Sequence, residues 1–299
     1  MRAPLVSVIC LCYNQEKHVQ AAIQSVFNQT YKNIELIVVD DASQDGSREK
    51  IEEILSGKSI WFIPLEKNVG NCKAFNIGFE SSKGEYIIDL AADDMLLPPR
   101  IEIGINDFAN SSEKSGVHFS DAFISNEQGQ ILFTHHKRNH SGELADPIPQ
   151  GDIYNELIHR YFVSPTTMMI KRQVLEELNG YDETLYFEDF DFWIRSARHY
   201  HYIFYKAPLV KKRKVSKSHS STQNQLLNKH QESTFRVCQK IFDLNKNPQE
   251  YQSLVKRSKY EIKQCLRTLN FRLIPKYLKL ISNSKSAYRR LSSPSNIEI

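Results

Sequence analysis

Residues 5–43 read LVSVICLCYNQEKHVQAAIQSVFNQTYKNIELIVVDDAS, and this stretch decides the fold. Two short apolar runs, residues 5–13 and 34–41, are strand-sized and rich in β-branched side chains, so they predict two buried strands. Between them, residues 16–29 place apolar side chains at the three- and four-residue spacing of an amphipathic helix. A strand, a helix and a second strand in this order predict the parallel strands of an α/β sheet.

The same alternation continues to about residue 125. Further strands are predicted at residues 59–65 and 85–91, and helical patterns lie at residues 47–56, 70–82 and 98–112. The sequence therefore predicts a sheet covered by helices. In such sheets ligands bind at the carboxyl ends of the strands, which is where polar segments follow the apolar runs of this chain.

After residue 125 the pattern changes, and three parts are predicted along the chain. Residues 126–222 alternate strand-like runs with helical patterns around a polar loop, and residues 216–225 have the composition of a linker. From about residue 225 the pattern is helical, with one apolar side supplied by Leu266, Leu269, Leu273 and Leu278. We predict an α/β half at 1–125, a second half of the same domain at 126–222 and a helical region at 223–299.

The chain has 299 residues, and its five cysteines are scattered along it. An odd and scattered set predicts neither a disulfide framework nor a zinc site, so we expect a reduced, cytoplasmic compartment. No apolar run reaches the ~20 residues of a membrane-spanning helix. No cleavable secretory signal is recognised near the first residues, and none is expected.

Charge is distributed unevenly along the chain. Residues 251–299 contain 11 Lys and Arg against 2 Asp and Glu, a net charge of +9, which leaves −5 for residues 1–250. A basic end on an acidic body suggests an anionic partner, such as phospholipid headgroups or nucleic acid. A solvated helical face and a partner subunit that packs on the leucines are the alternatives, and the sequence does not decide between them.

Paired acidic residues occur at three places. They are Asp40-Asp41, Asp93-Asp94 and Glu188-Asp189. Two adjacent negative charges at the end of a buried strand are costly unless a cation or a ligand offsets them. Each pair alone is also explained as a helix cap or as favourable charge in the first turn of a helix. If the fold brings the pairs together, they suit a divalent cation and a general base.

Several motifs, in order along the chain, resemble family 2 glycosyltransferases. They are VSVICLCYNQEKHVQAAIQSVFNQTYKNIELIVVDDASQDGS, NVGNCKAFNIG, GEYIIDLAADDMLLPPRIE and VLEELNGYDETLYFEDFDFWIR. The resemblance covers roughly residues 4–220. It implies the GT-A fold, a Rossmann-like mixed sheet flanked by helices, to which this chain adds a C-terminal helical extension. It also implies inverting transfer of a sugar from a nucleotide diphosphate donor.

On the donor side, the resemblance gives roles to four residues. Asp40 matches the Asp that hydrogen-bonds the base of the nucleotide. Tyr13 lies in the segment that flanks the base and the ribose. Asp93 matches a ribose contact, and Asp94 matches a ligand of Mg²⁺ or Mn²⁺.

Two positions depart from the family pattern. Ala91 replaces the first Asp of the frequent D-x-D-D motif, although some members dispense with that Asp. Phe75 replaces the Arg of the frequent A-R-N motif, and Lys73 is the candidate substitute near the donor. Asn68 belongs either to an anion-binding helix start or to a simple helix cap.

On the acceptor side, Asp189 matches the general base, with Glu188 beside it as a substrate contact. His219 lies about where some GT-A enzymes place a late metal-binding His, and a linker histidine is the alternative. Asp191 is expected to be a structural or solvated neighbour. Trp193 has helical spacing with apolar neighbours, which predicts a core position.

The resemblance implies a metal-dependent, non-processive glycosyltransferase that acts on a glycan or lipid-linked acceptor in cell-surface polysaccharide or glycolipid assembly. Processive synthases of the family carry a Gln-x-x-Arg-Trp motif, which this sequence lacks. A nucleotide-sugar-binding protein that has lost catalysis is the alternative, because of Ala91 and Phe75.

Other enzyme classes fit less well. No Gly-rich phosphate loop follows the first strand, which disfavours a nucleotidyltransferase and a dinucleotide oxidoreductase. A nucleic-acid partner is not expected for a transferase of this kind. For the basic end we predict contact with the anionic inner face of a membrane.

Overall fold

The computed structural model describes residues 3–57, 60–186, 188–214 and 230–293. The chain forms two compact units. The α/β unit comprises residues 1–151, 163–183 and 200–215, and the helical unit comprises residues 152–162, 184–199 and 216–299. The three-part division at residues 125 and 222 stays a prediction.

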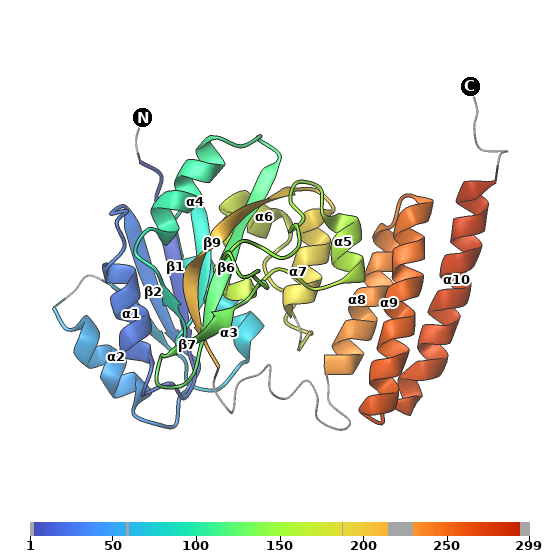
Figure 1. The fold of residues 1–299 in the computed structure, drawn as a ribbon. Helices are drawn as coiled ribbons and strands as arrows, with labels where there is room; N and C mark the ends of the chain where they lie inside the picture. Colours follow the sequence, from blue (N-terminus) through green and yellow to red (C-terminus); the bar gives the residue numbers. More distant parts are fainter. Residues whose placement is uncertain (1–2, 58–59, 187, 215–229, 294–299) are drawn as a thin grey trace. The chain divides into compact units, whose positions relative to one another are not determined.

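The first half of the α/β unit is a parallel sheet (Figure 1). Its elements are β1 (Val6–Cys12), α1 (Val19–Phe27), β2 (Ile34–Asp40), α2 (Ser47–Leu55), β3 (Trp61–Pro64), α3 (Asn71–Ser81) and β4 (Tyr86–Ala91). The strands pair in the order β3-β2-β1-β4, and all three pairings are parallel. The predicted alternation of strand and helix is confirmed in this half of the sheet.

Side chains of β1 alternate between the two faces of the sheet, as the pleat requires. One face joins a buried core with side chains of α1 and α2 through Val6, Val8, Cys10 and Cys12. On the other face, α3 approaches Ile9 closely at Gly78. A β-carbon at position 78 would lie 2.6 Å from Ile9 Cγ2, so a larger residue would push α3 away from the sheet.

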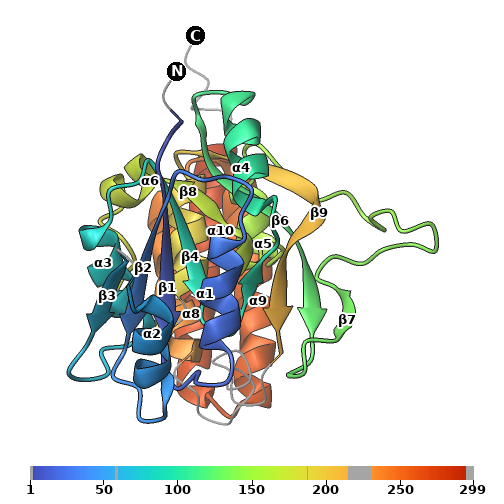
Figure 2. The same cartoon turned by 90° about the vertical axis from the view of Figure 1, so that its left-hand side faces the viewer.

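The sheet continues with mostly antiparallel pairings (Figure 2). The added elements are β5 (Met95–Leu96), α4 (Arg100–Ala109), β6 (Ser115–Ser125), β7 (Ile131–Thr134), η1 (Pro165–Thr167), β8 (Met169–Lys171), α6 (Arg172–Glu177) and β9 (His201–Arg213). Beyond β4 the order is β8-β6-β9-β5, and β7 pairs with β6. The β6–β9 pairing is parallel and the others are antiparallel. The mixed sheet is confirmed, whereas β5 is too short for any periodic pattern to predict.

The helical unit contains the predicted C-terminal helices. Its elements are α5 (Tyr154–His159), α7 (Glu188–Ala197), α8 (His230–Leu244), α9 (Pro248–Arg267), η3 (Phe271–Leu273) and α10 (Ile274–Ser292). Helix α9 begins at a capping box, in which the Asn247 side chain accepts from the Glu250 N–H (3.1 Å) and Glu250 accepts from the Asn247 N–H (3.4 Å). Trp193 is 2% exposed, which confirms its predicted core position.

The four leucines of the C-terminal helices do not share one buried side. Leu273 is fully buried, whereas Leu266, Leu269 and Leu278 are 51%, 45% and 55% exposed. The prediction of one apolar side is wrong because the chain leaves α9 after residue 267 and starts α10 only after η3, which changes the helical phase. Within the described ranges, no helix has both the length and the apolar character needed to span a membrane.

Candidate functional site

Four strand ends meet at the carboxyl edge of the parallel sheet. Cys12 at the end of β1 lies beside Asp40 of β2, and Asp40 lies beside Pro64 of β3. On the other side of β1, Leu11 pairs with Ala91 of β4. Neighbouring strands are about 4.8 Å apart, so the ends of β2 and β4 lie about 10 Å apart across β1.

Asp40 is buried at the end of β2 and already has partners. Its carboxylate accepts hydrogen bonds from the hydroxyl (2.5 Å) and the backbone N–H (3.2 Å) of Ser43, and it lies 3.5 Å from Nε of Arg48. The Arg48 guanidinium also donates to the carbonyl of Leu65, which follows β3 (2.9 Å). Arg48 therefore ties α2 to the ends of β2 and β3.

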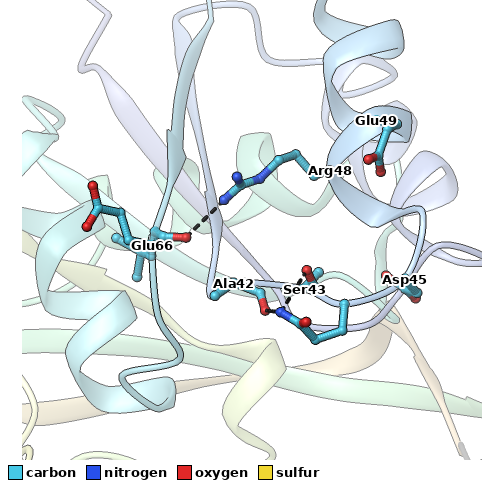
Figure 3. Close-up of a pocket in the computed structure, with 8 residues that line it drawn as sticks. Ala42, Ser43, Asp45, Arg48, Glu49 and Glu66 are labelled. Atoms are coloured by element: carbon cyan, nitrogen blue, oxygen red, sulfur yellow. Dashed lines mark hydrogen bonds between the residues drawn. The ribbon is translucent and has the colours of Figure 1, made fainter.

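A pocket of about 220 Å³ lies beside these residues. It is lined by Ala42, Ser43, Gln44, Asp45, Arg48, Glu49, Leu65 and Glu66. Figure 3 shows Arg48 reaching from α2 towards the backbone next to Glu66, with Ser43 below it. Sequence reasoning missed Arg48, because only the fold brings α2 against the end of β3.

The loops after β1 and β2 are joined by hydrogen bonds. The Asn14 N–H donates to the Ser43 hydroxyl (2.9 Å), and its side-chain oxygen accepts from the Gln44 N–H (2.7 Å). Asn14 and Ala42 have φ angles of 55° and 60°, which are uncommon for residues other than glycine. Tyr13, between the end of β1 and Asn14, has an exposed side chain.

Asp41 connects β2 to the start of α3, a contact that the sequence did not predict. Its carboxylate accepts from the N–H groups of Val69 (2.7 Å) and Gly70 (3.0 Å). Burial raises the pKa of Asp41, and these two bonds oppose the rise. Asn68 donates to the Asp41 carbonyl (3.2 Å). Asn68 is not the cap of α3, because that position is Gly70, whose φ of 88° favours glycine.

Asp93 and Asp94 form the turn between β4 and β5. Burial, together with the neighbouring charge of Asp93, raises the pKa of Asp94 to about 7. Burial also raises the pKa of Asp93, while Lys212 and Arg213 oppose that rise. The raised pKa values mean that the ionised forms of these two adjacent carboxylates are disfavoured. A bound cation would stabilise the ionised forms.

Arg213, at the end of β9, holds this turn through two contacts and the Glu127 loop through a third. Its N–H donates to Asp94 Oδ1 (2.8 Å), its Nε donates to the Asp93 carbonyl (3.1 Å), and its Nη1 donates to the Glu127 carbonyl (2.6 Å). Sequence reasoning missed Arg213, because it lies 119 residues after Asp94 in a basic run that resembles a solvated strand end.

The Asp93-Asp94 turn fits a Mg²⁺ or Mn²⁺ ion that binds together with a phosphate-bearing ligand. Among the described residues, no three His, Cys, Asp or Glu side chains are grouped as metal ligands. Magnesium is commonly held by one or two carboxylates, and substrate phosphates complete its shell. Asp94 supplies such a carboxylate, and Asp93 lies next to it. His219, the other predicted ligand, lies outside the described residues.

The segment around Lys73 connects α3 to residues 181–183. Phe75 is buried and stacks on Tyr181, with 4.3 Å between the ring centroids. Asn76 accepts from the Tyr181 N–H (2.9 Å) and donates to the Tyr181 carbonyl (3.0 Å). Lys73 Nζ lies 3.9 Å from a carboxylate oxygen of Glu183, and both side chains are about half exposed. The role of Lys73 near a donor stays a prediction.

Glu188 and Asp189 lie in the first turn of α7, in the helical unit, and both are half-buried. Asp191 in the same turn is fully buried, and its two oxygens each lie 2.6 Å from a cation, Arg195 Nε and Lys240 Nζ. These ion pairs make Asp191 a structural residue. The approach of Asp189 to the carboxyl edge of the sheet stays a prediction.

Residues 7–178, more than half of the chain, match the model described as glycosyl transferase family 2. The chain belongs to this family. The family 2 match extends from β1 to α6 and includes the carboxyl-edge residues from Tyr13 to Asp94. The resemblance seen in the sequence motifs is thereby confirmed.

Relatives in family 2 are similar over much of this chain. An uncharacterized glycosyltransferase of Rickettsia bellii is 30% identical over 230 residues, which are 77% of this chain and 32% of the relative. An uncharacterized glycosyltransferase of Methanocaldococcus jannaschii is 32% identical over 205 residues, which are 65% of each chain. The chain therefore spans about one third to two thirds of the length of these relatives.

Two solved structures have a similar fold. TarS of S. aureus (residues 1–349), in complex with UDP-GlcNAc, has a TM-score of 0.64 at 16% identity, over 96% of this chain and 92% of TarS. The mannosyltransferase PcManGT from Pyrobaculum calidifontis, in complex with GDP-Man and Mn²⁺, has a TM-score of 0.63 at 15% identity, over 96% of this chain and 76% of PcManGT. The GT-A fold predicted for a family 2 member is confirmed.

Proposed function

We propose that this chain is an inverting, metal-dependent, non-processive glycosyltransferase, which moves a sugar from a nucleotide diphosphate donor to an acceptor hydroxyl. The observation that carries the proposal is the carboxyl edge of the sheet. There Asp40 ends β2 and the Asp93-Asp94 turn follows β4, two strands whose ends lie about 10 Å apart on either side of the strand that leads to Tyr13. Membership of family 2 supports the same reaction class.

In this proposal the donor binds along the carboxyl edge. The Asp40 carboxylate accepts an N–H of the base, and Tyr13 forms a wall of the base pocket. Asp93 accepts from the ribose hydroxyls, while Asn68 and Lys73 provide polar contacts near the start of α3. The nucleotide sugars bound to TarS and PcManGT support a donor of this class.

Asp94 would hold a Mg²⁺ or Mn²⁺ ion. When bound, such an ion acts as a Lewis acid that stabilises negative charge on the departing diphosphate. The N–H of Arg213 fixes one carboxylate oxygen of Asp94. The Mn²⁺ in PcManGT supports a divalent cation, and His219 is a further proposed ligand.

Asp189 is the proposed general base, with Glu188 as a neighbouring substrate contact. Its carboxylate takes the proton of the acceptor hydroxyl as the oxygen attacks the anomeric carbon. The attack comes from the side opposite the leaving diphosphate, so a single displacement inverts the configuration of the sugar.

The acceptor is proposed to be a glycan or a lipid-linked glycan in cell-surface polysaccharide or glycolipid assembly. We place the chain in the cytoplasm, in peripheral contact with an anionic membrane surface and without a nucleic-acid partner. The net charge of +9 over residues 251–299 supports that contact.

Transfer assays with UDP- and GDP-sugars, glycan and lipid-linked acceptors, and Mn²⁺ test the proposal. Wild type should transfer sugar, and a chelator should abolish transfer. Asp189→Asn should lower kcat by about 10²- to 10⁴-fold, the usual contribution of a general base. Donor affinity, measured by calorimetry, should be unchanged in this variant. Full activity of Asp189→Asn would remove the residue from its role.

A nucleotide-sugar-binding protein without catalysis is the second candidate. Two features favour it, namely Ala91 in the Asp-rich motif and Phe75, which is buried against Tyr181 instead of offering a cation. Calorimetry that detects donor binding, combined with no turnover across the whole acceptor panel, would select this candidate.

A further inference from the structure

A groove lies between the N-terminal half of α9 and the C-terminal half of α10. Its volume is about 490 Å³, which is within the range of small-molecule sites. The lining residues are Tyr251, Gln252, Val255, Lys256, Lys259, Lys285 and Tyr288. The groove is part of the helical unit and shares no residue with the carboxyl edge of the sheet.

Among the residues that the structure describes, three lysines and no carboxylate line this groove. Lys256, Lys259 and Lys285 are exposed, and none forms an ion pair with another described residue. Glu250, next to the lining residue Tyr251, is already engaged by Arg198 (2.9 Å) and by the capping box of α9. Three like charges around one concave surface repel each other and attract an anion.

The groove also has an apolar wall. The Tyr251 hydroxyl donates to the Asn245 carbonyl (3.2 Å), and its ring packs edge-on against Phe242 with 5.5 Å between the centroids. Tyr251 is thus held in place, and Val255 and Tyr288 add further carbon surface. Lysines around aromatic and aliphatic surface suit an amphiphile with a phosphate group better than a free inorganic anion, which gains nothing from carbon surface.

We propose that the groove between α9 and α10 binds the phosphate headgroup of an anionic phospholipid at a bilayer surface. This inference rests on the membrane contact proposed above and gives that contact a specific site. Basic side chains beside apolar surface, here that of Tyr251, Val255 and Tyr288, are typical of segments that lie at a membrane interface.

Vesicle flotation with the full chain tests the site. The vesicles contain phosphatidylcholine alone or phosphatidylcholine with 30 mol% phosphatidylglycerol, and the test variant is Lys256→Gln/Lys285→Gln. The matched control is Lys263→Gln/Lys279→Gln, which removes the same charge from exposed positions of the same two helices outside the groove. Wild type should bind the anionic vesicles only. Each lysine at an anionic surface contributes about fivefold in affinity, so the test pair should lose about 25-fold and the control pair less than about threefold.

The possible outcomes distinguish failure of the groove as a binding site from failure of the proposed membrane contact. If wild type does not bind anionic vesicles, the proposed membrane contact fails. If both pairs of substitutions weaken binding equally, the groove fails as a specific site although the membrane contact stands. If inorganic phosphate at matched ionic strength raises the melting temperature as much as the vesicles do, the groove binds soluble anions and the bilayer assignment is overturned.

Discussion

At the scale of single residues, Arg213 holds the Asp93-Asp94 turn in position through hydrogen bonds. Its backbone N–H orients the carboxylate of Asp94, and its guanidinium holds the backbone at Asp93 and at Glu127. A guanidinium can donate to two carbonyls at once because its donors form a planar fork, whereas an ammonium is a point charge. The position of the proposed metal ligand therefore depends on a residue from a distant strand.

We expect Arg213→Ala to lower kcat/KM by about 10- to 100-fold, because small displacements of a catalytic group cost rate steeply. The Mn²⁺ concentration for half-maximal activity should rise in the same variant. For Arg213→Lys, both kcat/KM and this Mn²⁺ concentration should lie between the values of wild type and Arg213→Ala. Lys214→Ala is the matched control. Lys214 is exposed and adjacent to Arg213, and it contacts Ser125 through its backbone N–H, which the substitution keeps. An unchanged Mn²⁺ dependence in Arg213→Ala would contradict a positioning role.

His118 should make the stability of the α/β unit sensitive to acid. Its imidazole is fully buried and bonded to Asp107 (2.9 Å), and burial lowers its pKa to about 4. The unfolded chain binds the proton near pH 6.5, so stability present above that pH is lost as the pH falls towards 4. The expected loss from pH 7 to pH 5 is about 2 kcal/mol.

Urea unfolding at pH 7 and pH 5 measures this loss. His118→Gln places an amide where Nε2 of His118 meets Asp107, and an amide does not titrate. The variant should therefore lose much less stability than wild type between pH 7 and pH 5, because most of the loss of about 2 kcal/mol comes from His118. An equal pH dependence in wild type and variant would assign the acid sensitivity to other groups.

At the scale of elements, the start of α3 depends on the end of β2. The Asp41 carboxylate accepts the two N–H groups that precede α3, and Gly78 lets the same helix pack closely on Ile9. Asn76 then fixes the helix to Tyr181. These contacts set the position of α3 relative to the carboxyl edge.

Asp41→Ala should destabilise the chain by about 2 kcal/mol, because it leaves two N–H donors without their charged acceptor. Asp41→Asn should cost less, since its single amide oxygen keeps one of the two bonds. The midpoint of urea unfolding measures both. Glu49→Gln, which removes one exposed charge from α2, controls for charge and should change the midpoint little. Equal stability of Asp41→Ala and wild type would show that water replaces the carboxylate.

At the scale of the whole molecule, the residues with proposed functions are distributed over two units. All the proposed donor contacts from Tyr13 to Asp94 belong to the α/β unit, whereas the proposed base and the basic groove belong to the helical unit. The helical unit has buried ion pairs of its own, among them Arg257 with Glu261 at 3.2 Å. Ligands of the two sites should therefore stabilise different parts of the chain.

A nucleotide-sugar donor with Mn²⁺ should raise the melting temperature of the α/β unit. At a hundred times its Kd, a ligand adds about 2.7 kcal/mol, which corresponds to roughly 5–10 °C for a unit of this size. Differential scanning calorimetry measures the shift for each nucleotide sugar and thereby identifies the donor. In Asp94→Asn the additional shift caused by Mn²⁺ should disappear; if it persists, Asp94 does not hold the ion.

Local patterns in the sequence were enough to predict the elements of the parallel half. Strand and helix periodicities appear within windows of 5 to 15 residues, so β1 to β4 and α1 to α4 were all recognised. Asp40, Asp93 and Asp94 were found because each lies at or shortly after the end of a predicted strand and matches a family motif. The two-residue strand β5 and the six-residue helix α5 were too short to give such a signal.

Tertiary structure alone decided which distant residues support the site. Arg48, Asp41 and Arg213 act through partners up to 120 residues away, and no local pattern encodes such pairings. The same holds for the groove, whose lysines on α9 and α10 come together only when the two helices pack. The sequence by itself determined the fold class, the family and the edge of the sheet that carries the acidic residues. Strand register and helix packing determined the neighbours of those residues, because they follow from side-chain packing across the whole core and not from the local chain.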